Sequence, residues 1–360
     1  MSLTFNIQNY KCFKSLSISL GKITILAGSN SVGKSSVIQG LLLLRNAWET
    51  KRDNFLPLIG PFLLHLGGVK EILWKDANDI DEIKFILKYG KSNNPAFTTL
   101  KVDRSQNEPM IQDVNIPGEY PVGKNTFYYL NAERIGPRMN YQYYSQKFPN
   151  TGYRGEATFQ LLLTKIKHMI DEKRVFHKTE DESRLFLQQV KYWLEYIIPG
   201  ADFENALEIG RSKEIEASIN ENLPTNVGFG ISYALPIIVN GLIAKEGSMF
   251  IVENPEAHLH PSGQSRIGKF LARMAASGLQ VVVETHSEHV INGVRIAVLE
   301  DELPHTDAVI NFFQTNEKKQ VEVIEIGLNT EADLTAFPKG FFDQTQQDLA
   351  RIIQLKRGKR

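Results

Sequence analysis

The stretch "ITILAGSNSVGKSSVIQGLLLLRNAW", residues 23–48, decides the fold. Its first five residues are apolar or β-branched, which is typical of a buried strand. The pattern G-x-x-x-x-G-K-S follows at 28–35, and from Lys34 onward the sequence has the broad apolar face of a helix. A strand, a glycine-rich loop and a helix in this order form the context that a phosphate-binding loop requires. The sequence therefore predicts an α/β nucleotide-binding domain.

The loop offers the groups that hold a nucleotide phosphate. Its glycines let backbone N–H groups curl around an anion at the start of the helix. Lys34 would reach the β- and γ-phosphates of ATP, and the Ser35 hydroxyl would ligate Mg²⁺. The alternative is a glycine- and serine-rich turn that precedes a lysine by chance. The predicted phosphate-binding residues are Gly28, Ser29, Asn30, Ser31, Val32, Gly33, Lys34, Ser35 and Ser36.

Composition narrows the class of protein. The 360 residues are 42% hydrophobic and 23% charged, which is ordinary for a globular chain. A formal net charge of zero excludes a domain that is basic throughout, although not a local basic patch. Cys12 is the only cysteine, so we expect neither a disulfide framework nor a cysteine-based zinc site. The first residues lack the layout of a signal peptide, and no apolar run reaches the roughly 18 residues that span a bilayer. We expect a cytoplasmic protein with no membrane partner.

The pattern along the chain changes twice. Strand-like segments fill the first part, at 3–10, 16–20, 82–88, 97–102 and 126–131. Helical periods follow at 155–170 and 182–198, and strands alternate with helices again after 213. The sequence thus predicts one nucleotide-binding domain split by a largely helical insertion. Residues 1–50 hold its N-terminal part, 51–212 the continuing β lobe and the insertion, 213–302 its C-terminal part, and 303–360 a short C-terminal appendage.

An acidic strand end supplies the second half of the predicted site. In "MFIVENPEAHLHP", residues 249–261, four apolar residues run into Glu253. A phosphate loop needs an acid on a neighbouring strand to hold Mg²⁺ and to position the attacking water. A further apolar strand ends in "VVVETHSEH", residues 281–289.

The joint order of these segments resembles the ABC-type ATPases. The segments are the phosphate loop, a long insertion, "NVGFGIS", "ENPEAHLHP" and "VVVETHSEH". The chain looks most like the stand-alone branch that includes the ATPase parts of OLD-type nucleases, the Septu-type defence ATPases and the RecF/SMC-like repair proteins. The opening "IQNYKCFKSLSISLGKITILAGSNSVGKSS", the phrase "YLNAERIGPR" and the later "FPKGFFDQTQQDL" add to this resemblance.

The resemblance implies a P-loop NTPase fold of the ABC type and a role for each motif. Glu253 stands at the Mg²⁺-binding acid, and His286 at the switch histidine that senses the γ-phosphate. The glycine-rich turn, with Gly228, Gly230 and Ser232, stands at the signature motif, which contacts the γ-phosphate of the opposite subunit in a homodimer. Taken alone, that turn is also typical of a plain loop before a helix. No glutamine occurs in "IGPFLLHLGGVKEI", residues 59–72, where the glutamine loop is expected.

One residue departs from the ABC-type pattern. The residue after the Mg²⁺-binding acid is usually a glutamate that polarises the lytic water, and here it is Asn254. An amide cannot take a proton, although it can orient a water. Glu256 and Glu284 are the carboxylates that remain to act as general base. We expect slow hydrolysis assisted by one of them, and the alternative is an ATP-bound clamp that barely hydrolyses.

The histidines allow a second chemistry. A zinc site could be built from an H-x-H pair with a distant histidine and an acid. We disfavour zinc, because the resemblance brings both strand ends to one sheet edge without a metal, and places the H-x-H pair in the segment that crosses a dimer interface. The histidines concerned are His258, His260, His286 and His289.

Several basic residues are candidates for contacts with phosphate or nucleic acid. Arg134 and Arg138 lie in "NAERIGPRMNY", and the alternative for them is simple solvation. A further group could form a patch that faces DNA. Neighbouring acids, Asp171, Glu172, Glu180, Asp181 and Glu182, favour a solvated charged face for most of that group. The group comprises Lys165, Lys167, Lys173, Arg174, Lys178 and the terminal "LKRGKR".

The resemblance implies a function in bacterial antiphage defence. We expect a Mg²⁺-ATPase that dimerises around two ATP molecules and regulates a separately encoded effector, with a nuclease as one candidate. The stretch after Leu303 is too short for the nuclease domain of OLD-type proteins. The rivals are a DNA-repair or chromosome-maintenance ATPase that binds DNA directly, a non-hydrolysing ATP-dependent scaffold and a transporter motor. The missing long coiled coil disfavours the first, and the lack of a readable membrane partner disfavours the last.

Overall fold

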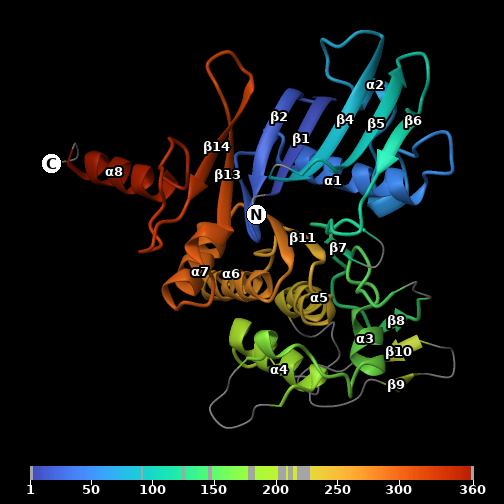
Figure 1. The fold of residues 1–360 in the computed structure, drawn as a ribbon. Helices are drawn as coiled ribbons and strands as arrows, with labels where there is room; N and C mark the ends of the chain where they lie inside the picture. The colour runs from blue at the N-terminus through green and yellow to red at the C-terminus, as the bar shows by residue number, and fades with distance from the viewer. Residues whose placement is uncertain are drawn as a thin grey trace.

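The computed structural model describes residues 3–90, 92–123, 126–144, 148–176, 183–201, 208–209, 214–216 and 228–357. It combines two large sheets, one small sheet and helices on both faces of the larger parallel one (Figure 1). The predicted α/β class is confirmed. Within the described ranges, no helix is both long enough and apolar enough to cross a bilayer.

A six-stranded sheet forms the centre of the molecule. Its order is β14 (Val321–Gly327), β13 (Ala308–Thr315), β3 (Ile23–Gly28), β12 (Gln280–Glu284), β11 (Met249–Glu253) and β7 (Phe127–Leu130). All neighbours are parallel except β13 and β14. The strands read as continuous apolar runs because helices cover both faces of a parallel sheet. The phosphate loop and the two acidic strand ends therefore meet at one edge, with Glu253 in register with Glu284.

A five-stranded antiparallel sheet packs beside it. Its order is β2 (Phe13–Leu20), β1 (Leu3–Tyr10), β4 (Ile80–Tyr89), β5 (Ala96–Asp103) and β6 (Met110–Asn115). Four of these strands contain the segments predicted from alternating apolar residues. β6 was not among the predicted strands, because polar residues interrupt its apolar ones and its side chains are exposed or half-exposed.

Helix α1 (Lys34–Glu49) lies between these two sheets. One hydrophobic core joins its apolar residues to side chains of the antiparallel sheet and to one face of the parallel sheet. A helix buried on two sides needs apolar residues around most of its circumference, which explains the run "GLLLL". This packing fixes the phosphate loop, which ends where α1 begins.

Three helices cover the other face of the parallel sheet. They are α5 (Phe229–Ile243), α6 (Pro261–Ala276) and α7 (Glu288–Leu299), and they share a second core with that face. Each follows or precedes a strand of the sheet, as the predicted alternation requires. α5 therefore brings the glycine-rich turn close to the segment that follows β11.

The predicted insertion contains shorter helices than its periodicity indicates. α3 spans Thr158–Thr164 and α4 spans Phe186–Ile197, with a 3-10 turn η2 at Glu172–Arg174. α3 ends early because the chain turns at 169–170, where Met169 bridges to Leu185 and the Ile170 N–H bonds to the Arg184 carbonyl. A small sheet, β8 (Asn140–Gln142), β10 (Glu214–Glu216) and β9 (Glu208–Ile209), completes this region.

Arg174 is not part of a basic surface, which corrects the expectation of a DNA-facing patch at that position. Its side chain is buried and donates to the carbonyls of Gly241, Leu242 and Ala244 at the end of α5, and to the Ser277 hydroxyl. It closes the C-terminus of a helix, where orphan carbonyls need donors. Lys178, Glu180, Asp181, Glu182 and the last three residues lie outside the described residues.

The segment after residue 303 adds both a strand pair and a helix. β13 pairs in parallel with β3, so that Phe313 faces Gly28, and β14 continues the sheet. Between α7 and β13 lies a 3-10 turn, η4 (His305–Asp307). Helix α8 (Gln344–Arg357) then leaves the body of the molecule (Figure 1). The sheet therefore runs across the predicted boundary at 303.

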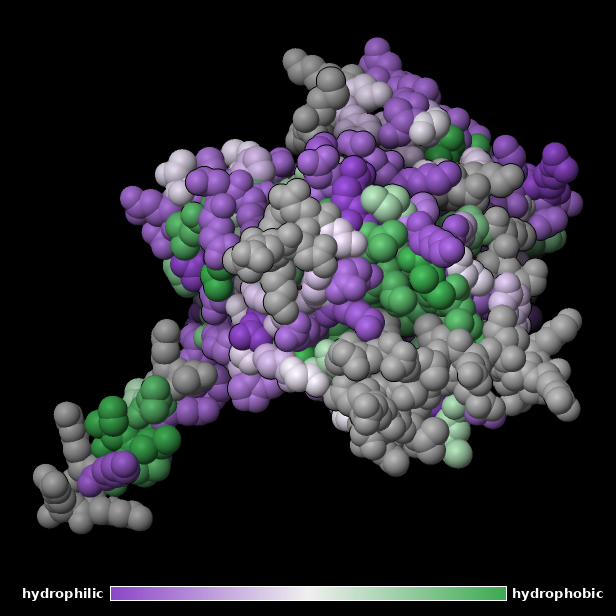
Figure 2. Space-filling model, turned by 90° about the horizontal axis from the view of Figure 1, so that it is seen from below, coloured by the Kyte–Doolittle hydropathy of each residue, from purple (hydrophilic) through white to green (hydrophobic). Residues whose placement is uncertain are grey.

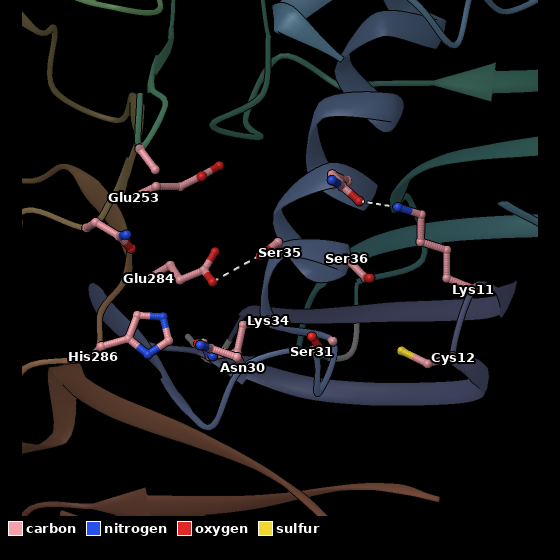
Figure 3. Close-up of a pocket in the computed structure, with 14 residues that line it drawn as sticks. Lys11, Cys12, Asn30, Ser31, Lys34, Ser35, Ser36, Glu253, Glu284 and His286 are labelled. Carbon is pink, nitrogen blue, oxygen red and sulfur yellow. Dashed lines mark hydrogen bonds between the residues drawn. The ribbon is translucent and has the colours of Figure 1, made fainter. Parts of the chain in front are cut away.

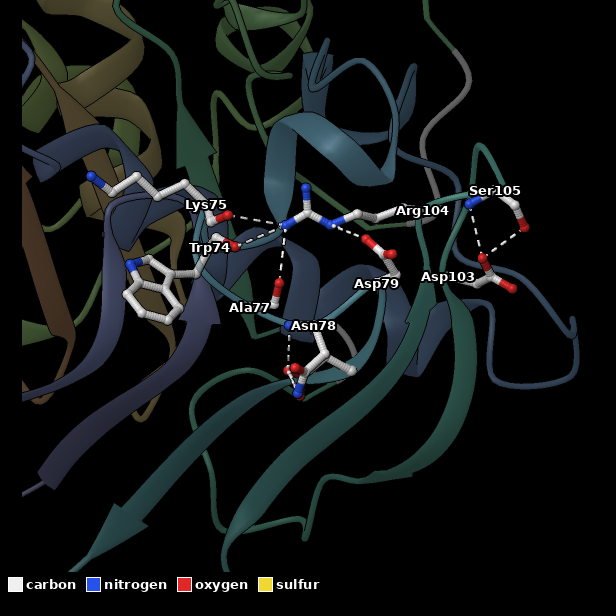
Figure 4. A network of polar contacts seen from close by, with 9 residues as sticks. Trp74, Lys75, Ala77, Asn78, Asp79, Asp103, Arg104 and Ser105 are labelled. Carbon is white, nitrogen blue, oxygen red and sulfur yellow. Dashed lines mark hydrogen bonds and ion pairs between the residues drawn. The ribbon is translucent and has the colours of Figure 1, made fainter.

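Residues 59–72, the expected place of the glutamine loop, form two short turns beside the antiparallel sheet. They are η1 (Pro61–Leu63) and α2 (Val69–Ile72). The chain that leaves α2 is held by Arg104, whose guanidinium donates to the carbonyls of Trp74, Lys75 and Ala77 and pairs with Asp79 at 3.5 Å (Figure 4). This arginine fixes the approach to β4.

Candidate functional site

A cavity of about 470 Å³ opens between the phosphate loop, the turn from β1 to β2 and the ends of β11 and β12 (Figure 3). It is the meeting place of segments from four parts of the sequence. The parallel sheet brings them together because the carboxyl ends of its strands share one edge. The predicted site residues that line it are Asn30, Ser31, Gly33, Lys34, Ser35, Ser36, Glu253, Asn254, Glu284 and His286.

The phosphate loop needs its glycines for steric reasons. Gly28 and Gly33 have φ values of 135° and 100°, in the region that favours glycine. A Cβ at Gly28 would lie 2.2 Å from the Phe313 carbonyl oxygen, and one at Gly33 would lie 2.6 Å from the Phe13 ring. Strand β13 and the start of β2 therefore lie against the loop on two sides. Val32 is buried, so it anchors the loop and does not face the cavity.

Lys34 bridges the loop from inside. Its Nζ donates to the carbonyls of Gly28 at 2.9 Å and Ser29 at 2.6 Å. Burial lowers the pKa of Lys34, and the nearby Glu284 charge opposes this effect. These two carbonyls hold the ammonium at the position where it can exchange them for phosphate oxygens.

Ser35 joins the loop to the acid at the end of β12. Its hydroxyl donates to Glu284 Oε1 at 3.0 Å, across 249 residues of sequence (Figure 3). Glu284 Oε2 is buried and has no hydrogen-bond partner among the described residues. Burial raises the pKa of Glu284 to about 7, and the neighbouring Glu253 charge adds to this rise. A carboxylate with a buried, unpartnered oxygen is costly unless a cation or a donor completes it.

Glu253 occupies a different environment, although it is the register partner of Glu284. The Tyr129 hydroxyl donates to its Oε1 at 2.8 Å, and the Ala132 N–H donates to its carboxylate. Burial raises the pKa of Glu253, and these two hydrogen bonds counteract the rise. Asn131 in turn donates to the Tyr129 oxygen at 2.8 Å, which fixes the hydroxyl.

Asn254 has a left-handed backbone, with φ 45°. Its N–H donates to the Glu284 carbonyl at 2.8 Å, and its carbonyl receives Arg134 at 3.1 and 3.2 Å. Asparagine tolerates this conformation better than most residues do. The strand end is therefore held by backbone contacts on both sides.

Arg134 is the residue that holds this strand end. It is buried, donates to the backbone carbonyls of Glu253 and Asn254, and lies 5.4 Å from the Tyr233 ring centre. Burial lowers its pKa to about 10. The suggested contact of Arg134 with nucleic acid does not fit this position, because the guanidinium is enclosed by protein. Arg138 is exposed, and its backbone N–H donates to the Tyr141 hydroxyl at 3.2 Å.

Both carboxylate oxygens of Glu256 accept hydrogen bonds from the residues that follow β12. Its Oε2 receives the Thr285 hydroxyl and its Oε1 receives the His286 N–H, both at 2.8 Å. Both carboxylate oxygens thus fix the segment that carries His286. Partial burial and the Lys34 charge lower the pKa of His286, which favours its neutral imidazole.

The signature-like turn lies away from the cavity of its own chain. Gly228 is exposed just before α5, whereas Ser232 is buried in the second turn of that helix. A Cβ at Gly230 would lie 2.9 Å from the His258 carbonyl, so glycine permits close packing there. Asn226 and Val227, the start of the quoted "NVGFGIS", lie outside the described residues.

The four histidines have separate partners. His258 packs between Phe229 and Tyr233 at centroid distances of 5.2 and 4.6 Å. His260 caps α6 and lies 3.0 Å from the Ser262 hydroxyl, while the His289 N–H bonds to Ser287 at the start of α7. In the ranges that the structure describes, no group of three or more His, Cys, Asp or Glu side chains could hold a metal ion.

Sequence reasoning missed several contributors to the site. Lys11 and Cys12, in the turn between β1 and β2, line the cavity, and Lys11 donates to Gln39 of α1. Tyr129 positions Glu253 from the end of β7. The phrase "NYKCF" was already part of the family resemblance and could have directed attention to the turn. No local pattern marks Tyr129, because its partner lies 124 residues away.

The donor set at the strand ends fits a magnesium ion. Ser35 and the two register-paired carboxylates offer only oxygen atoms, which are the ligands that Mg²⁺ prefers. Glu284 Oε2, buried without a partner among the described residues, is the atom that most needs such a cation. Mg²⁺ at phosphate sites takes one or two protein oxygens and completes its shell with phosphate and water. The cavity therefore suits a metal-bound nucleoside triphosphate.

Most of the chain is similar to known proteins. Residues 1–120 and 124–291 match the family described as AAA ATPase domain, and residues 303–352 match a family described as protein of unknown function (DUF3696). An OLD nuclease from Thermus scotoductus is 24% identical over 331 residues, which cover 78% of this chain. The chain spans only 58% of the length of that relative.

Solved structures of SMC heads are also similar. The SMC head domain from Thermotoga maritima matches with a TM-score of 0.44 and 9% identity, over 90% of this chain and 98% of that one. The Smc head domain from Pyrococcus furiosus, with an extended coiled coil and bound to the C-terminal domain of ScpA, matches with a TM-score of 0.49 and 10% identity, over 97% and 98%.

Proposed function

The chain belongs to the AAA ATPase domain family, and from this premise we propose that it binds ATP with Mg²⁺, hydrolyses it slowly and forms a homodimer around the nucleotide. Within this proposal the cavity beside the phosphate loop is the ATP site. ATP and Mg²⁺ are the cofactors it takes.

The bond between Ser35 and Glu284 carries the proposal. It places the hydroxyl expected to ligate Mg²⁺ against a carboxylate with one unpartnered oxygen. Lys34 stands on the same loop with its ammonium held by two carbonyls that a phosphate can replace. Glu253, in register with Glu284, adds a second carboxylate to the metal side of the site. Bound Mg²⁺ would supply positive charge for the β- and γ-phosphate oxygens.

Glu284 is the best candidate for the carboxylate that replaces the missing glutamate at Asn254. Glu256 has both oxygens engaged by the backbone and hydroxyl of the next strand end, so it acts as a positioning residue for His286. Glu284 faces the cavity, and one of its oxygens has no hydrogen-bond partner among the described residues, so it can accept a proton from a water there. Asn254 can orient a water without taking its proton. Hydrolysis on this basis is slow, because one carboxylate serves both the metal and the water.

The position of the signature-like turn supports the proposed homodimer. Gly228 and Phe229 are exposed at the start of α5, and neither lines the cavity of its own chain. In the proposed dimer they face the γ-phosphate in the other copy. Ser232, which is buried, supports the turn from behind.

The biological role we propose is regulation of a separately encoded effector in antiphage defence. The similarity to an OLD nuclease supports this role, although the chain spans 58% of that relative. A nuclease is the first candidate for the effector, and nucleic acid is a candidate ligand of the complex. In this scheme the ATP-dependent closing of the dimer is the signal that the effector senses.

Nucleotide turnover by the purified full chain tests the core of the proposal. We expect phosphate release with ATP and Mg²⁺ that Lys34→Ala abolishes, and nucleotide binding that the same variant weakens at least tenfold. Lys318→Ala, in the turn between β13 and β14, is the matched control and should behave as wild type. ATP binding and ATP-dependent dimerisation without any Lys34-dependent phosphate release would establish the non-hydrolysing scaffold instead.

The effector role is tested by purifying the native complex from its host. We expect a co-purifying protein whose nuclease activity changes when ATP is added, and does not change when the complex carries Lys34→Ala. A complex whose activity ignores both ATP and Lys34 would overturn the regulatory role while leaving the ATPase proposal intact.

A further inference from the structure

Phe229 is an exposed ring that the body of the molecule holds in place. It lies at the start of α5 and is 54% exposed. Its ring packs against the His258 ring, with centroids 5.2 Å apart, and against Gly136, where a Cβ would come within 2.7 Å of it. The exposed apolar side chains of α8 stand instead on an arm apart from the body, as Figure 2 shows. An exposed ring with neighbours on two sides is preorganised for contact with a partner.

A continuous row of side chains runs inward from Phe229. The His258 ring meets the Tyr233 ring edge-on at a centroid distance of 4.6 Å, and the Arg134 guanidinium lies 5.4 Å from the Tyr233 ring centre. We call these four residues, Phe229, His258, Tyr233 and Arg134, the aromatic row. Exposure falls along it, from the exposed rings of Phe229 and His258 to the buried Arg134. The aromatic row therefore connects the surface of the molecule to its interior.

The inner end of the aromatic row holds the strand end that carries Glu253. Arg134 donates to the backbone carbonyls of Glu253 and Asn254, and both of these residues line the nucleotide cavity. The Nε of Arg134 is buried without a hydrogen-bond partner in the described part of the chain. A buried cation is costly unless neighbouring groups compensate its charge, and the π face of Tyr233 is one such group. Tyr233 therefore helps to fix the guanidinium that fixes the end of β11.

The backbone fixes the middle of the aromatic row. His258 has a left-handed conformation, with φ 62°, which a residue other than glycine keeps only where its surroundings enforce it. Its carbonyl oxygen lies so close to Gly230 that a Cβ there would be 2.9 Å away. The start of α5 and the turn after β11 are thus in close contact. A shift of one displaces the other, because closely packed groups transmit strain.

From these contacts we propose that Tyr233 is a positioning residue for the Mg²⁺-binding end of β11, and that it acts through Arg134. Phe229, at the outer end of the aromatic row, is then the group through which a second copy of the chain acts on the same site. This inference rests on the proposed function, which supplies both the metal and the second copy. Closing of the dimer on Phe229 and metal binding in the same chain are linked, and the linkage is equal in both directions.

Mg²⁺ affinity in the presence of ADP tests the role of Tyr233. ADP lacks the γ-phosphate that the second copy would contact, so isothermal titration with ADP measures the metal site of a single chain. Tyr233→Leu should weaken Mg²⁺ binding about tenfold, as the loss of a group that positions a metal ligand does. Tyr233→Phe keeps the ring face and should retain the wild-type affinity. Equal Mg²⁺ affinities of the Leu and Phe variants would overturn the role of the ring.

A double variant tests whether Tyr233 acts through Arg134. Arg134→Met alone should weaken Mg²⁺ binding at least as much as Tyr233→Leu alone. Adding Tyr233→Leu to Arg134→Met should cause no further loss, because the guanidinium that the ring positions is already absent. Two losses that multiply would show that the residues act independently, and would overturn the proposal. Circular dichroism checks that each variant is folded, and the comparison of Tyr233→Leu with Tyr233→Phe remains decisive if the double variant is not.

Two exposed phenylalanines test the outer end of the aromatic row. Phe229→Ala should weaken Mg²⁺ binding with ADP about threefold, although Phe229 does not line the cavity. Phe337→Ala, which removes a ring that is 72% exposed outside the row, should bind Mg²⁺ as wild type does. Wild-type affinity in Phe229→Ala would overturn the link to the surface. A wild type that binds no Mg²⁺ with ADP would overturn the proposed function itself, whereas Mg²⁺ binding that none of the variants changes would overturn this inference alone.

Discussion

The ends of β11 and β12 carry acids in register, yet the two ends are built differently. At the end of β11 each acid accepts two hydrogen bonds. Glu253 accepts from Tyr129 and Ala132, and Glu256 accepts from Thr285 and His286, which follow β12. At β12 only Ser35 serves Glu284, and one carboxylate oxygen is left buried without a partner among the described residues. Residue type is the same, so the number of donors decides the role. The donors hold Glu253 and Glu256 in place, whereas Glu284 keeps a free oxygen that can take part in the chemistry of the site.

The comparison predicts its largest effect for Glu284→Gln. We expect kcat for ATP hydrolysis to fall about 100- to 1,000-fold, because the change removes both the metal-facing charge and the proton acceptor. Nucleotide binding should persist, since Lys34 and the phosphate loop are untouched. Steady-state phosphate release and equilibrium nucleotide binding are the two measurements.

Glu256→Gln is the matched control for that change. The amide keeps one oxygen for the His286 N–H but loses the second acceptor, so we expect no more than about a tenfold loss of kcat. Equal losses of kcat in Glu284→Gln and Glu256→Gln would show that the two carboxylates do not differ in role. A larger loss in the Glu256 variant would make Glu256 the general base.

Replacing Arg134 removes the donor that holds the end of β11 and leaves every carboxylate unchanged. Arg134→Met should lower the free energy of unfolding by about 2–3 kcal/mol, because buried carbonyls of Glu253 and Asn254 lose their donor. Denaturant unfolding measures this loss. Arg138→Met, four residues later and exposed, is the control and should change stability little. Equal stability of the two variants would mean that the end of β11 does not depend on the arginine.

Much of the fold was predictable because its signals are local. The strand, loop and helix around Lys34 predicted the nucleotide-binding core, and apolar runs predicted the strands β11 and β12, while the family resemblance implied that they end at one edge. β6 was missed because its apolar residues are interrupted by polar ones, and the end of α3 was missed because a bridge to Leu185 redirects the chain. β13 carries a readable apolar run, "AVINFF", but its place in the sheet depends on pairing with β3 from the other end of the chain.

The sequence did not predict which residues donate hydrogen bonds to each acid of the site. The sequence identified Glu253, Glu256 and Glu284 as candidate acids, but it left open which of them is free. That depends on partners from distant segments, such as Tyr129 for Glu253 and Ser35 for Glu284. Arg134 stood at the right place in the sequence for a ligand contact, and burial gave it a structural role. Hydrogen-bond partners are a property of the tertiary fold, which spacing alone does not encode.

The raised pKa of Glu284 predicts that Mg²⁺ binding depends on pH. Its carboxyl must lose a proton before it can ligate a metal, and burial beside Glu253 raises its pKa to about 7. Mg²⁺ affinity in the presence of ADP should therefore fall about tenfold between pH 8 and pH 6, as protonation removes the ligand. Isothermal titration at several pH values measures this. Glu284→Gln should bind more weakly with no such dependence, and an unchanged profile in that variant would assign the titration elsewhere.

The smallest effect is predicted for Tyr129→Phe. This change leaves Glu253 with one hydrogen-bond donor, as Glu284 has. The hydroxyl bond lowers the pKa of Glu253, so its loss raises that pKa further above the ordinary value. A carboxyl with a raised folded-state pKa costs stability when it is ionised, and costs nothing when it is protonated in both states. We therefore expect Tyr129→Phe to lower the free energy of unfolding by about 1 kcal/mol at pH 8 and by less at pH 4. Urea unfolding at both pH values measures the difference. A loss that is equal at the two pH values would show that Tyr129 contributes packing alone, and that the donors around Glu253 do not separate it from Glu284.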